Sequence, residues 1–260
     1  DFQDVAYGDE YLDLLRPFVD LSRGPEHALG CAAAKHIANA MAYDDVIRVA
    51  DLKTRGSRFD RIDRQMDRKG RPMHITEFMH PRAEEVCGLL PARVGRWIEA
   101  RPRLLRWFDR RINRGRRIRS NRVRGFLMLY LIAGLRDRRR GTLRHAVEHS
   151  HWTAWLDQAR AVLPQDPALA VEVLKCRRLI KGYSDTHGRG QSKFDRVLSA
   201  LPALIGRGDA ADWLRRLCDA ALQDEEGAAL DGALKTVESF TGSSQPEREH
   251  AADSRSPPRS

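Results

Sequence analysis

The stretch EHALGCAAAKHIANAMAYDDVIRVADLKT, residues 26–54, decides the fold class. Its apolar positions recur at intervals of three and four residues, which brings them onto one face of an α-helix. These positions are Leu29, Ala33, Ile37, Ala40, Met41, Ile47 and Ala50. The spacing predicts one long, alanine-rich helix. The same period runs through most of the chain, whereas the alternation typical of strands is rare, so the sequence predicts an all-α fold.

Prolines, glycines and polar capping residues mark the ends of the other helices. These helices are predicted at 7–21, 57–68, 82–100 with a break at Pro91, 121–135, 142–163, 167–181, 191–205 and 209–240. Residues 70–81, GRPMHITEFMHP, are predicted to form a loop or a short extended piece. We expect a single multi-helix domain over residues 1–240 with long interhelical loops. Residues 241–260 are polar and lack aromatic side chains, which predicts a disordered tail.

Positive charge is concentrated in one segment of the chain. The net charge is +10, and residues 93–144 contain eighteen arginines against three acidic residues, a local balance of +15. Such a field attracts phosphate, nucleic acid, anionic cofactors or an acidic protein face. Trp97 and Trp107 stand among the arginines, so a basic helical nucleic-acid-binding module is the alternative. No nucleic-acid-binding signature occurs, and charge runs are usually solvated surface or protein contacts, which favours one of these two over nucleic-acid binding.

Cysteine spacing and hydropathy exclude several classes of protein. Cys31, Cys87, Cys176 and Cys218 lie far apart without a CxxC pair, so neither a disulfide framework nor a zinc or iron–sulfur site of this chain is predicted. The longest apolar run, residues 126–133, is much shorter than the roughly 20 residues that cross a bilayer. We therefore expect a soluble, cytoplasmic protein with reduced thiols.

Two polar segments are candidates for contact with a ligand or a partner. KGYSDTHGRG, residues 181–190, combines three glycines with cationic and hydroxyl side chains that suit a phosphate or carboxylate. The second segment, residues 74–85, brings acid, base and cation together. The candidate residues are Glu77, His80, Arg82, Lys181, Tyr183, Asp185, Thr186, His187 and Arg189. The structural alternatives are an interhelical turn with capping residues and a buried loop anchored by Phe78 and Met79.

The sequence His145-Ala146-Val147-Glu148-His149 matches the H-x-x-E-H pattern of the inverted zinc peptidases. The two histidines, however, continue an ordinary packing stripe that includes Trp152 and Leu156. We therefore predict a structural helix face here, and we predict no metal site and no catalytic residue in this chain.

Five segments, taken together and in order, resemble one known family. They are YDDVIRVADLKTR (43–55), ITEFMHPRAEEVCGLLPARVGRW (75–97), RGFLMLYLIAGLR (124–136), LRHAVEHSHWTAWL (143–156) and RLIKGYSDTHGRG (178–190). They resemble the C-terminal helical domain of indolepyruvate ferredoxin oxidoreductases of the fused beta-subunit type. The runs EFMHPR and KGYSDTHGRG are the most specific parts of the resemblance.

The resemblance implies an oxidoreductase that decarboxylates an aryl 2-oxoacid to an acyl-CoA. Such an enzyme uses thiamine diphosphate, iron–sulfur clusters and coenzyme A, and it passes electrons to ferredoxin. None of these cofactors is expected in this chain, which would be an accessory or assembly domain, inactive when isolated. Its expected partners are the upstream gamma-type catalytic domain or a partner subunit, with ferredoxin as a further candidate. The resemblance assigns no catalytic residue to the motif positions, so the two polar segments stay candidates for contact alone.

Overall fold

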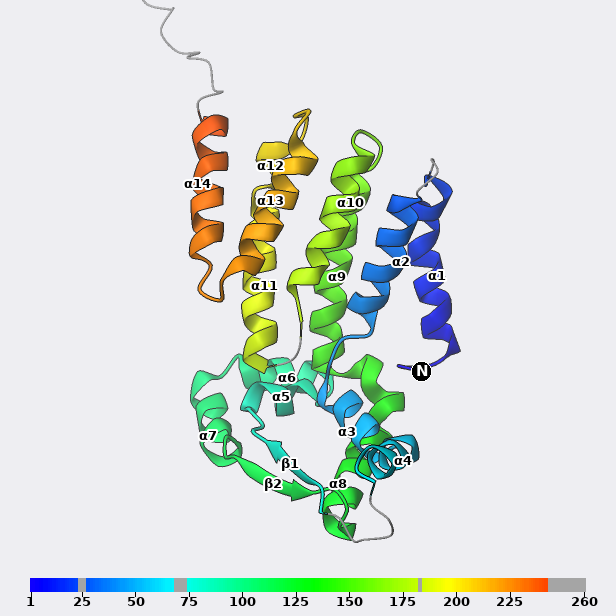
Figure 1. Ribbon diagram of the computed structural model, residues 1–260. Helices are drawn as coiled ribbons and strands as arrows, with labels where there is room; N and C mark the ends of the chain where they lie inside the picture. The colour runs from blue at the N-terminus through cyan, green and yellow to red at the C-terminus, as the bar shows by residue number, and fades with distance from the viewer. Residues whose placement is uncertain (23–26, 68–73, 182–183, 243–260) are drawn as a thin grey trace, which may run out of the picture.

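The computed structural model describes residues 1–22, 27–67, 74–181 and 184–242. These residues are predominantly helical, as the apolar spacing predicts. Long helices stand side by side in a unit that we call the bundle, and a smaller unit, which we call the basic lobe, lies at one end of it (Figure 1). The lobe is an insertion in the bundle, because its residues, 46–141, fall between two neighbouring bundle helices.

The bundle is built from the two ends of the chain. Its elements are α1 (Val5–Asp20), α2 (Ala28–Met41), α9 (Leu143–Val162), α10 (Pro167–Lys175), the 3-10 helix η2 (Cys176–Leu179), α11 (Ser184–Ser199), α12 (Leu201–Leu204), α13 (Ala210–Gln223) and α14 (Ala228–Gly242). α1 packs on α2, α2 on α10, α10 on α13 and α13 on α14. The apolar face of each helix is therefore covered by its neighbours in the row.

The bundle surrounds one continuous hydrophobic core, to which α9 contributes Trp152, Trp155, Leu156 and Ala159. These residues follow the three- and four-residue spacing of a single helix face. The indole Nε1 of Trp155 donates a hydrogen bond to the Val173 carbonyl oxygen at 2.8 Å. A large aromatic side chain is thus buried with its polar atom paired.

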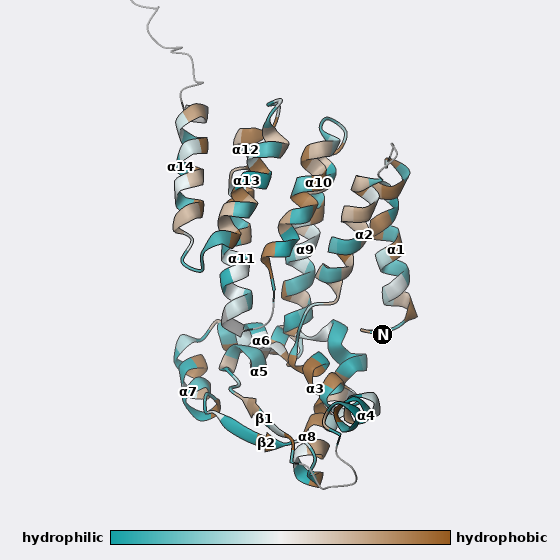
Figure 2. Ribbon diagram, in the orientation of Figure 1, coloured by the Kyte–Doolittle hydropathy of each residue, from teal (hydrophilic) through white to brown (hydrophobic). Residues whose placement is uncertain are grey.

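The basic lobe is less regular. Its elements are α3 (Val46–Thr54), α4 (Gly56–Gln65), β1 (Thr76–Met79), α5 (Ala83–Gly88), α6 (Ala92–Glu99), α7 (Pro102–Ile112), β2 (Arg116–Arg119), α8 (Val123–Ala133) and the 3-10 helix η1 (Gly134–Gly141). β1 and β2 form an antiparallel ribbon in which Thr76 lies opposite Arg119 and Met79 opposite Arg116. α3 packs against α8. The helix α8 is strongly apolar, whereas β2 is hydrophilic (Figure 2).

The prediction of one helix over residues 26–54 is wrong. The helix α2 ends at Met41 and α3 begins at Val46. Asp45 caps α3, because its Oδ1 accepts a hydrogen bond from the Arg48 backbone nitrogen at 2.6 Å. Asp45 also binds the buried guanidinium of Arg139, with Oδ2 at 2.9 Å from Nε. This pairing joins the start of the lobe, where the chain leaves the bundle at Asp45, to η1, from which the chain returns to the bundle.

Other element boundaries also differ from the prediction. β1 is the extended piece foreseen within residues 70–81, but β2 lies in an arginine-rich stretch for which no strand was predicted. α11 begins at Ser184 rather than at residue 191. The predicted helix 209–240 is two helices, since Gly227 has a φ of +85° and the Asp224 carboxylate accepts from the Ala229 backbone nitrogen at 3.0 Å.

The predicted disordered tail lies outside the described residues, apart from its first two positions, which belong to α14. Among the described helices, none combines the length and apolar character needed to cross a membrane.

Candidate functional site

A buried polar cluster is centred on Glu148 of α9, at the junction of the bundle and the basic lobe. The carboxylate Oε1 lies 2.8 Å from Arg144 Nη2, one helical turn earlier, and 3.0 Å from His187 Nε2 of α11. Its Oε2 lies 3.7 Å from Arg177 Nη2 of η2. A single buried carboxylate therefore ties together α9, η2 and α11.

The surroundings of Glu148 favour its ionised form. Burial alone raises the pKa of Glu148, but the hydrogen bond from His187 and the positive charges of Arg144 and Arg177 outweigh it, and the pKa lies below its usual value. Burial lowers the pKa of Arg177. The Nη1 atom of Arg177 is also buried and has no hydrogen-bond partner among the described residues. The cluster thus holds one carboxylate among several cationic donors.

Aromatic and imidazole groups lie next to this cluster. The Tyr43 hydroxyl is 3.1 Å from His145 Nδ1, and the Tyr7 hydroxyl donates to the Met41 carbonyl oxygen at 3.0 Å. Burial raises the pKa of both tyrosines and lowers the pKa of His145 to about 4. At neutral pH these groups are uncharged and serve as hydrogen-bonding parts of the packed interior.

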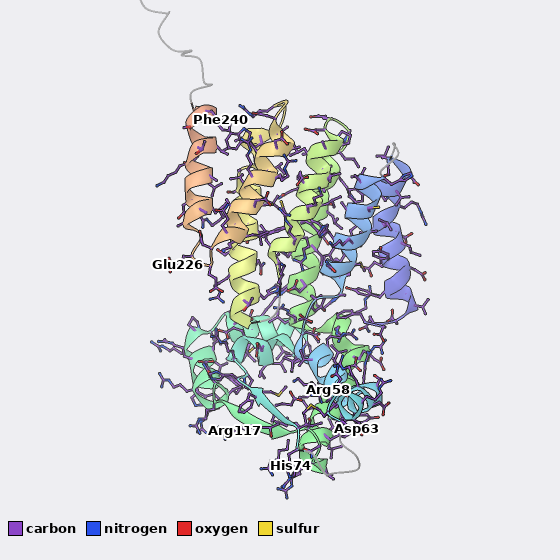
Figure 3. The ribbon with its side chains drawn as sticks, in the orientation of Figure 1. Arg58, Asp63, His74, Arg117, Glu226 and Phe240 are labelled. Carbon is purple, nitrogen blue, oxygen red and sulfur yellow. The ribbon has the colours of Figure 1, made fainter. Side chains whose placement is uncertain are left out.

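A second buried carboxylate, Glu77 of β1, holds the ribbon to the rest of the lobe. It pairs with Lys53 of α3 and with Arg58 of α4, and Ser120 Oγ donates to it at 3.4 Å. Burial raises the pKa of Glu77. The hydrogen bond from Lys53 and the positive charges of Lys53 and Arg58 have a larger, opposite effect, so the pKa lies below its usual value. Arg58 lies on α4 in the basic lobe, well away from the bundle (Figure 3).

Residues 1–200 match the model of a family of unknown function, DUF6537. The chain belongs to this family. No curated protein and no solved structure matches the chain. The DUF6537 match ends at Ala200, just after α11, so it contains the whole basic lobe and both carboxylate clusters. The helices α12, α13 and α14 lie beyond the matched residues.

In this DUF6537 chain the polar segment 181–190 is divided between a connection and the first turns of α11. His187 is buried and binds Glu148. The exposed candidates are Lys181, Thr186 and Arg189. Arg189 Nη1 lies 3.7 Å from Glu225 Oε2 on the surface. Tyr183 and the side chain of Asp185 lie outside the described residues.

One glycine of this segment has a structural explanation. A Cβ atom on Gly190 would lie 2.6 Å from the Leu179 carbonyl oxygen, so only glycine lets α11 pack this closely on η2. This glycine therefore serves helix packing, which is the structural alternative for at least that position of the motif.

The candidates of the other polar segment are spread over different environments. Glu77 is buried and His80 is exposed. Arg82 is half-buried and is the N-cap residue of α5. The Arg82 backbone nitrogen donates to Glu85 Oε2 at 3.3 Å. Within the described part of the chain, no hydrogen bond or ion pair joins the Glu77 cluster to the Glu148 cluster. The two predicted segments thus do not build a single pocket.

The residues of the H-x-x-E-H pattern point to different partners. His145 binds Tyr43, Glu148 binds the cationic cluster, and His149 packs on Trp152 with ring centroids 4.5 Å apart. In the ranges that the structure describes, no group of three His, Cys, Asp or Glu side chains could hold a metal ion. The helix-face interpretation accounts for these contacts.

Sequence reasoning identified Glu77 and His187 but missed the residues that engage them. From the sequence, Arg144 is only one of the arginines of residues 93–144, and Arg177 only a position in the helix predicted at 167–181. A glutamate on an otherwise buried helix face is the one signal that could have pointed to the cluster, because such a charge needs a partner. Which cation becomes that partner depends on how distant segments of the chain pack together.

Proposed function

We propose that this chain is an accessory or assembly domain of an indolepyruvate (aryl 2-oxoacid):ferredoxin oxidoreductase. It acts by binding other parts of the enzyme and supports oxidative decarboxylation to an acyl-CoA without a catalytic centre of its own. Thiamine diphosphate, the iron–sulfur clusters and coenzyme A belong, in this proposal, to the rest of the enzyme. Its partners are the gamma-type catalytic domain or a partner subunit, with ferredoxin as a second candidate.

The observation that carries the proposal is the way the resembling segments meet in space. Residues 143–156 supply Glu148 and residues 178–190 supply His187, whereas residues 43–55 supply Lys53 and residues 75–97 supply Glu77. These segments are far apart in the chain, yet their polar residues form the two buried clusters. The resemblance therefore follows one folded unit, which is what a shared domain requires and what scattered short matches would not give.

The state of the buried carboxylates supports a binding role over a chemical one. Asp45, Glu77 and Glu148 are each engaged by cationic side chains of this chain. A general acid or base must reach a substrate proton directly or through one water molecule. Enclosed, charge-paired carboxylates hold segments together instead. Many other arginines of the basic lobe, such as Arg96, Arg103 and Arg119, lie on the surface, where they can make contacts.

The test uses the complete enzyme and a version that lacks residues 1–240 of this chain. Oxidation of indolepyruvate is measured with coenzyme A, once with ferredoxin and once with methyl viologen, a small acceptor that needs no protein docking. Copurification of the partner subunit and cluster content are measured on both proteins. We expect the deletion to lower ferredoxin-coupled turnover at least tenfold while the remaining enzyme stays folded and cluster-loaded.

The two acceptors separate the forms of the proposal. Loss of turnover with ferredoxin alone would identify a docking role towards ferredoxin, whereas loss with both acceptors together with loss of the partner subunit would identify assembly. Unchanged turnover with both acceptors would contradict the proposal. Steeply salt-dependent binding of RNA or DNA by the chain would then favour the nucleic-acid alternative.

A further inference from the structure

The helix α8, VRGFLMLYLIA, is apolar around almost its whole circumference, with Arg124 near its start as the one charged residue. One side is used inside the lobe: Leu129 is fully buried, and the rings of Phe126 and Phe59 have centroids 6.3 Å apart. A helix that is apolar on all sides is normally covered on all sides. Within the described residues, however, the opposite side of α8 faces the outside of the protein.

The exposed side forms one continuous stripe. Val123, Leu127, Tyr130 and Leu131 are spaced as i, i+4, i+7 and i+8, which brings them onto a single helix face. Their exposed fractions are 82%, 50%, 59% and 64%, respectively. Scattered exposed apolar residues are ordinary, but a contiguous patch of this kind marks a binding surface.

Arginines border the stripe. The nine residues from Arg116 to Arg124 contain five arginines and no acidic residue. A shallow hollow of about 380 Å³ is lined by Arg117, Arg119, Arg122, Arg124, Ile118, Gly125 and Met128. Met128 lies on α8 beside the stripe, so the hollow and the stripe form one surface, which we call the α8 surface. Arg117, labelled in Figure 3, lies at the far end of the lobe from the bundle.

These arginines are available for an external partner. In the described part of the chain, no carboxylate lies within ion-pair distance of Arg119, Arg122 or Arg124. A guanidinium group presents a planar fork that matches a carboxylate, and such pairs add specificity at the edge of an apolar contact. The surface therefore has the apolar centre and charged border of a protein interface.

We infer that the α8 surface docks an amphipathic helix of a partner protein, with an apolar stripe facing α8 and Asp or Glu side chains along the edge that meets the arginines. The α8 helix has 11 residues and is about 16 Å long, which suits side-by-side packing with three turns of another helix. The inference stands apart from the proposed function, because it rests on this surface alone and holds whichever protein supplies the helix.

Charge argues against a second copy of the chain as the occupant, since two α8 surfaces packed face to face would bring two sets of arginines together. The mostly aliphatic stripe argues against nucleic acid. Proteins that bind single strands stack successive bases on several aromatic side chains, whereas Tyr130 is the one aromatic residue among the four of the stripe. An acidic, amphipathic helix satisfies both the stripe and the arginines.

The test measures fluorescence anisotropy of a labelled synthetic helical peptide of about 18 residues, five turns, with leucines on one face and glutamates beside them. A second peptide keeps every glutamate and replaces the leucines with serine. We expect the first peptide to bind the chain at least tenfold more tightly than the second. The double variant Leu127→Ser/Leu131→Ser should weaken binding of the first peptide at least tenfold, and so should Arg122→Glu/Arg124→Glu.

The matched control is Leu12→Ser/Val19→Ser, which removes two comparably exposed apolar side chains from α1 and should leave peptide binding unchanged. Circular dichroism and thermal unfolding verify that every variant is folded. Equal binding of both peptides, or no saturable binding of the first peptide below about 1 mM, would overturn the inference. So would an RNA hairpin or phosphatidylserine vesicles that displace the first peptide and bind more tightly than it does.

Discussion

The bundle and the basic lobe use their apolar residues in opposite ways. In the bundle, the apolar faces of α2, α9, α10 and α13 close on one continuous core. The lobe buries apolar side chains in smaller groups. Cys87 and Ile98 cluster with Leu143, the first residue of α9, and Ile47 and Leu129 are buried on the packed helices α3 and α8. Many large apolar side chains of the lobe remain exposed on its surface. Its exposed large apolar residues include Phe78, Trp97, Trp107, Tyr130 and Leu131.

Under the proposed docking role, the bundle supplies most of the stability and the lobe supplies the contacts with partners. A small core contributes little hydrophobic free energy. Besides the packing of α3 on α8, the lobe is held by ion pairs such as Arg139 with Asp45 and Lys53 with Glu77. Elements that bind partners are commonly drawn from the less stable regions of a protein. Four predictions test how far the difference extends.

The largest effect is expected from Trp155→Ala in the bundle. Trp155 is 1% exposed and its Nε1 is hydrogen-bonded, so its removal leaves a cavity and should lower the free energy of unfolding by about 4 kcal/mol. The matched lobe variant Trp107→Ala removes the same side chain at 53% exposure and should cost less than about 0.5 kcal/mol. Urea unfolding followed by circular dichroism measures both, and similar costs for the two variants would break the comparison.

The next effect concerns the buried charge between the two units. Glu148→Gln leaves Arg144 and Arg177 without their carboxylate and should lower the free energy of unfolding by about 3 kcal/mol. The control Glu225→Gln alters an exposed glutamate whose nearest cation, Arg189, is 3.7 Å away, and it should change stability by less than about 0.5 kcal/mol. A neutral result for Glu148→Gln in urea unfolding would mean that the cluster does not hold the junction.

A smaller, local effect is expected from Ile98→Ala in the lobe core. The side chain is 6% exposed, and its truncation should cost about 2 kcal/mol, the lower end of the range for such a change. Hydrogen exchange should accelerate at the amides of α5 and α6 while those of α9 beyond Trp152 keep their protection. Uniform acceleration over the whole chain would show instead that the lobe and the bundle unfold as one unit.

The mildest effect is a dependence of stability on pH that arises in the bundle. Burial, with a contribution from Lys35 and other nearby cations, lowers the pKa of His36 to about 4, whereas an unfolded histidine has a pKa of about 6.5. Between these values the unfolded chain binds more protons, so the stability that neutral His36 contributes is complete above pH 6.5 and is lost as the pH falls towards 4. His145 has the same sign and a similar pKa.

Melting temperatures recorded from pH 7 to pH 4 measure this slope. The variant His36→Gln should reduce it, whereas His74→Gln, which alters an exposed histidine of the lobe, should leave it unchanged. A slope that is the same in all three proteins would remove His36 as its source. Glu148 acts in the same direction at lower pH. Because its pKa is lowered in the folded protein, its contribution to stability is complete above the unfolded pKa of about 4.3 and is lost as the pH falls below that value.

The sequence predicts where most helices of the bundle lie, because local apolar spacing marks them, but it merges α13 with α14 and begins α11 too late. The end of α2 could not be predicted in the same way, since Asp45 is fixed by Arg139, 94 positions further along the chain. The strand β2 was missed because its residues, RRIR, have no apolar face that would reveal it. Its conformation depends on pairing with β1.

For the candidate site, the sequence allowed single residues to be predicted but not their partners. Glu77 and His187 stood out by their chemistry, but sequence spacing does not tell which cation meets which carboxylate. The α8 surface was visible as an apolar run and as an arginine-rich stretch. That one side of the helix stays uncovered is a property of the packed molecule, because only the structure separates the side that holds Leu129 from the side that holds Leu131.

The insertion of the lobe also has a kinetic consequence. The helices α2 and α9 pack together, although the whole lobe separates them in the chain, and closing a flexible loop of about 100 residues costs about 4 kcal/mol of entropy. Pairing of Asp45 with Arg139 closes nearly the same loop, so once this pair has formed, α2 and α9 are already close to each other. The order of events during folding should therefore run from the lobe ends to the bundle, and Asp45→Asn should slow refolding more than it speeds unfolding.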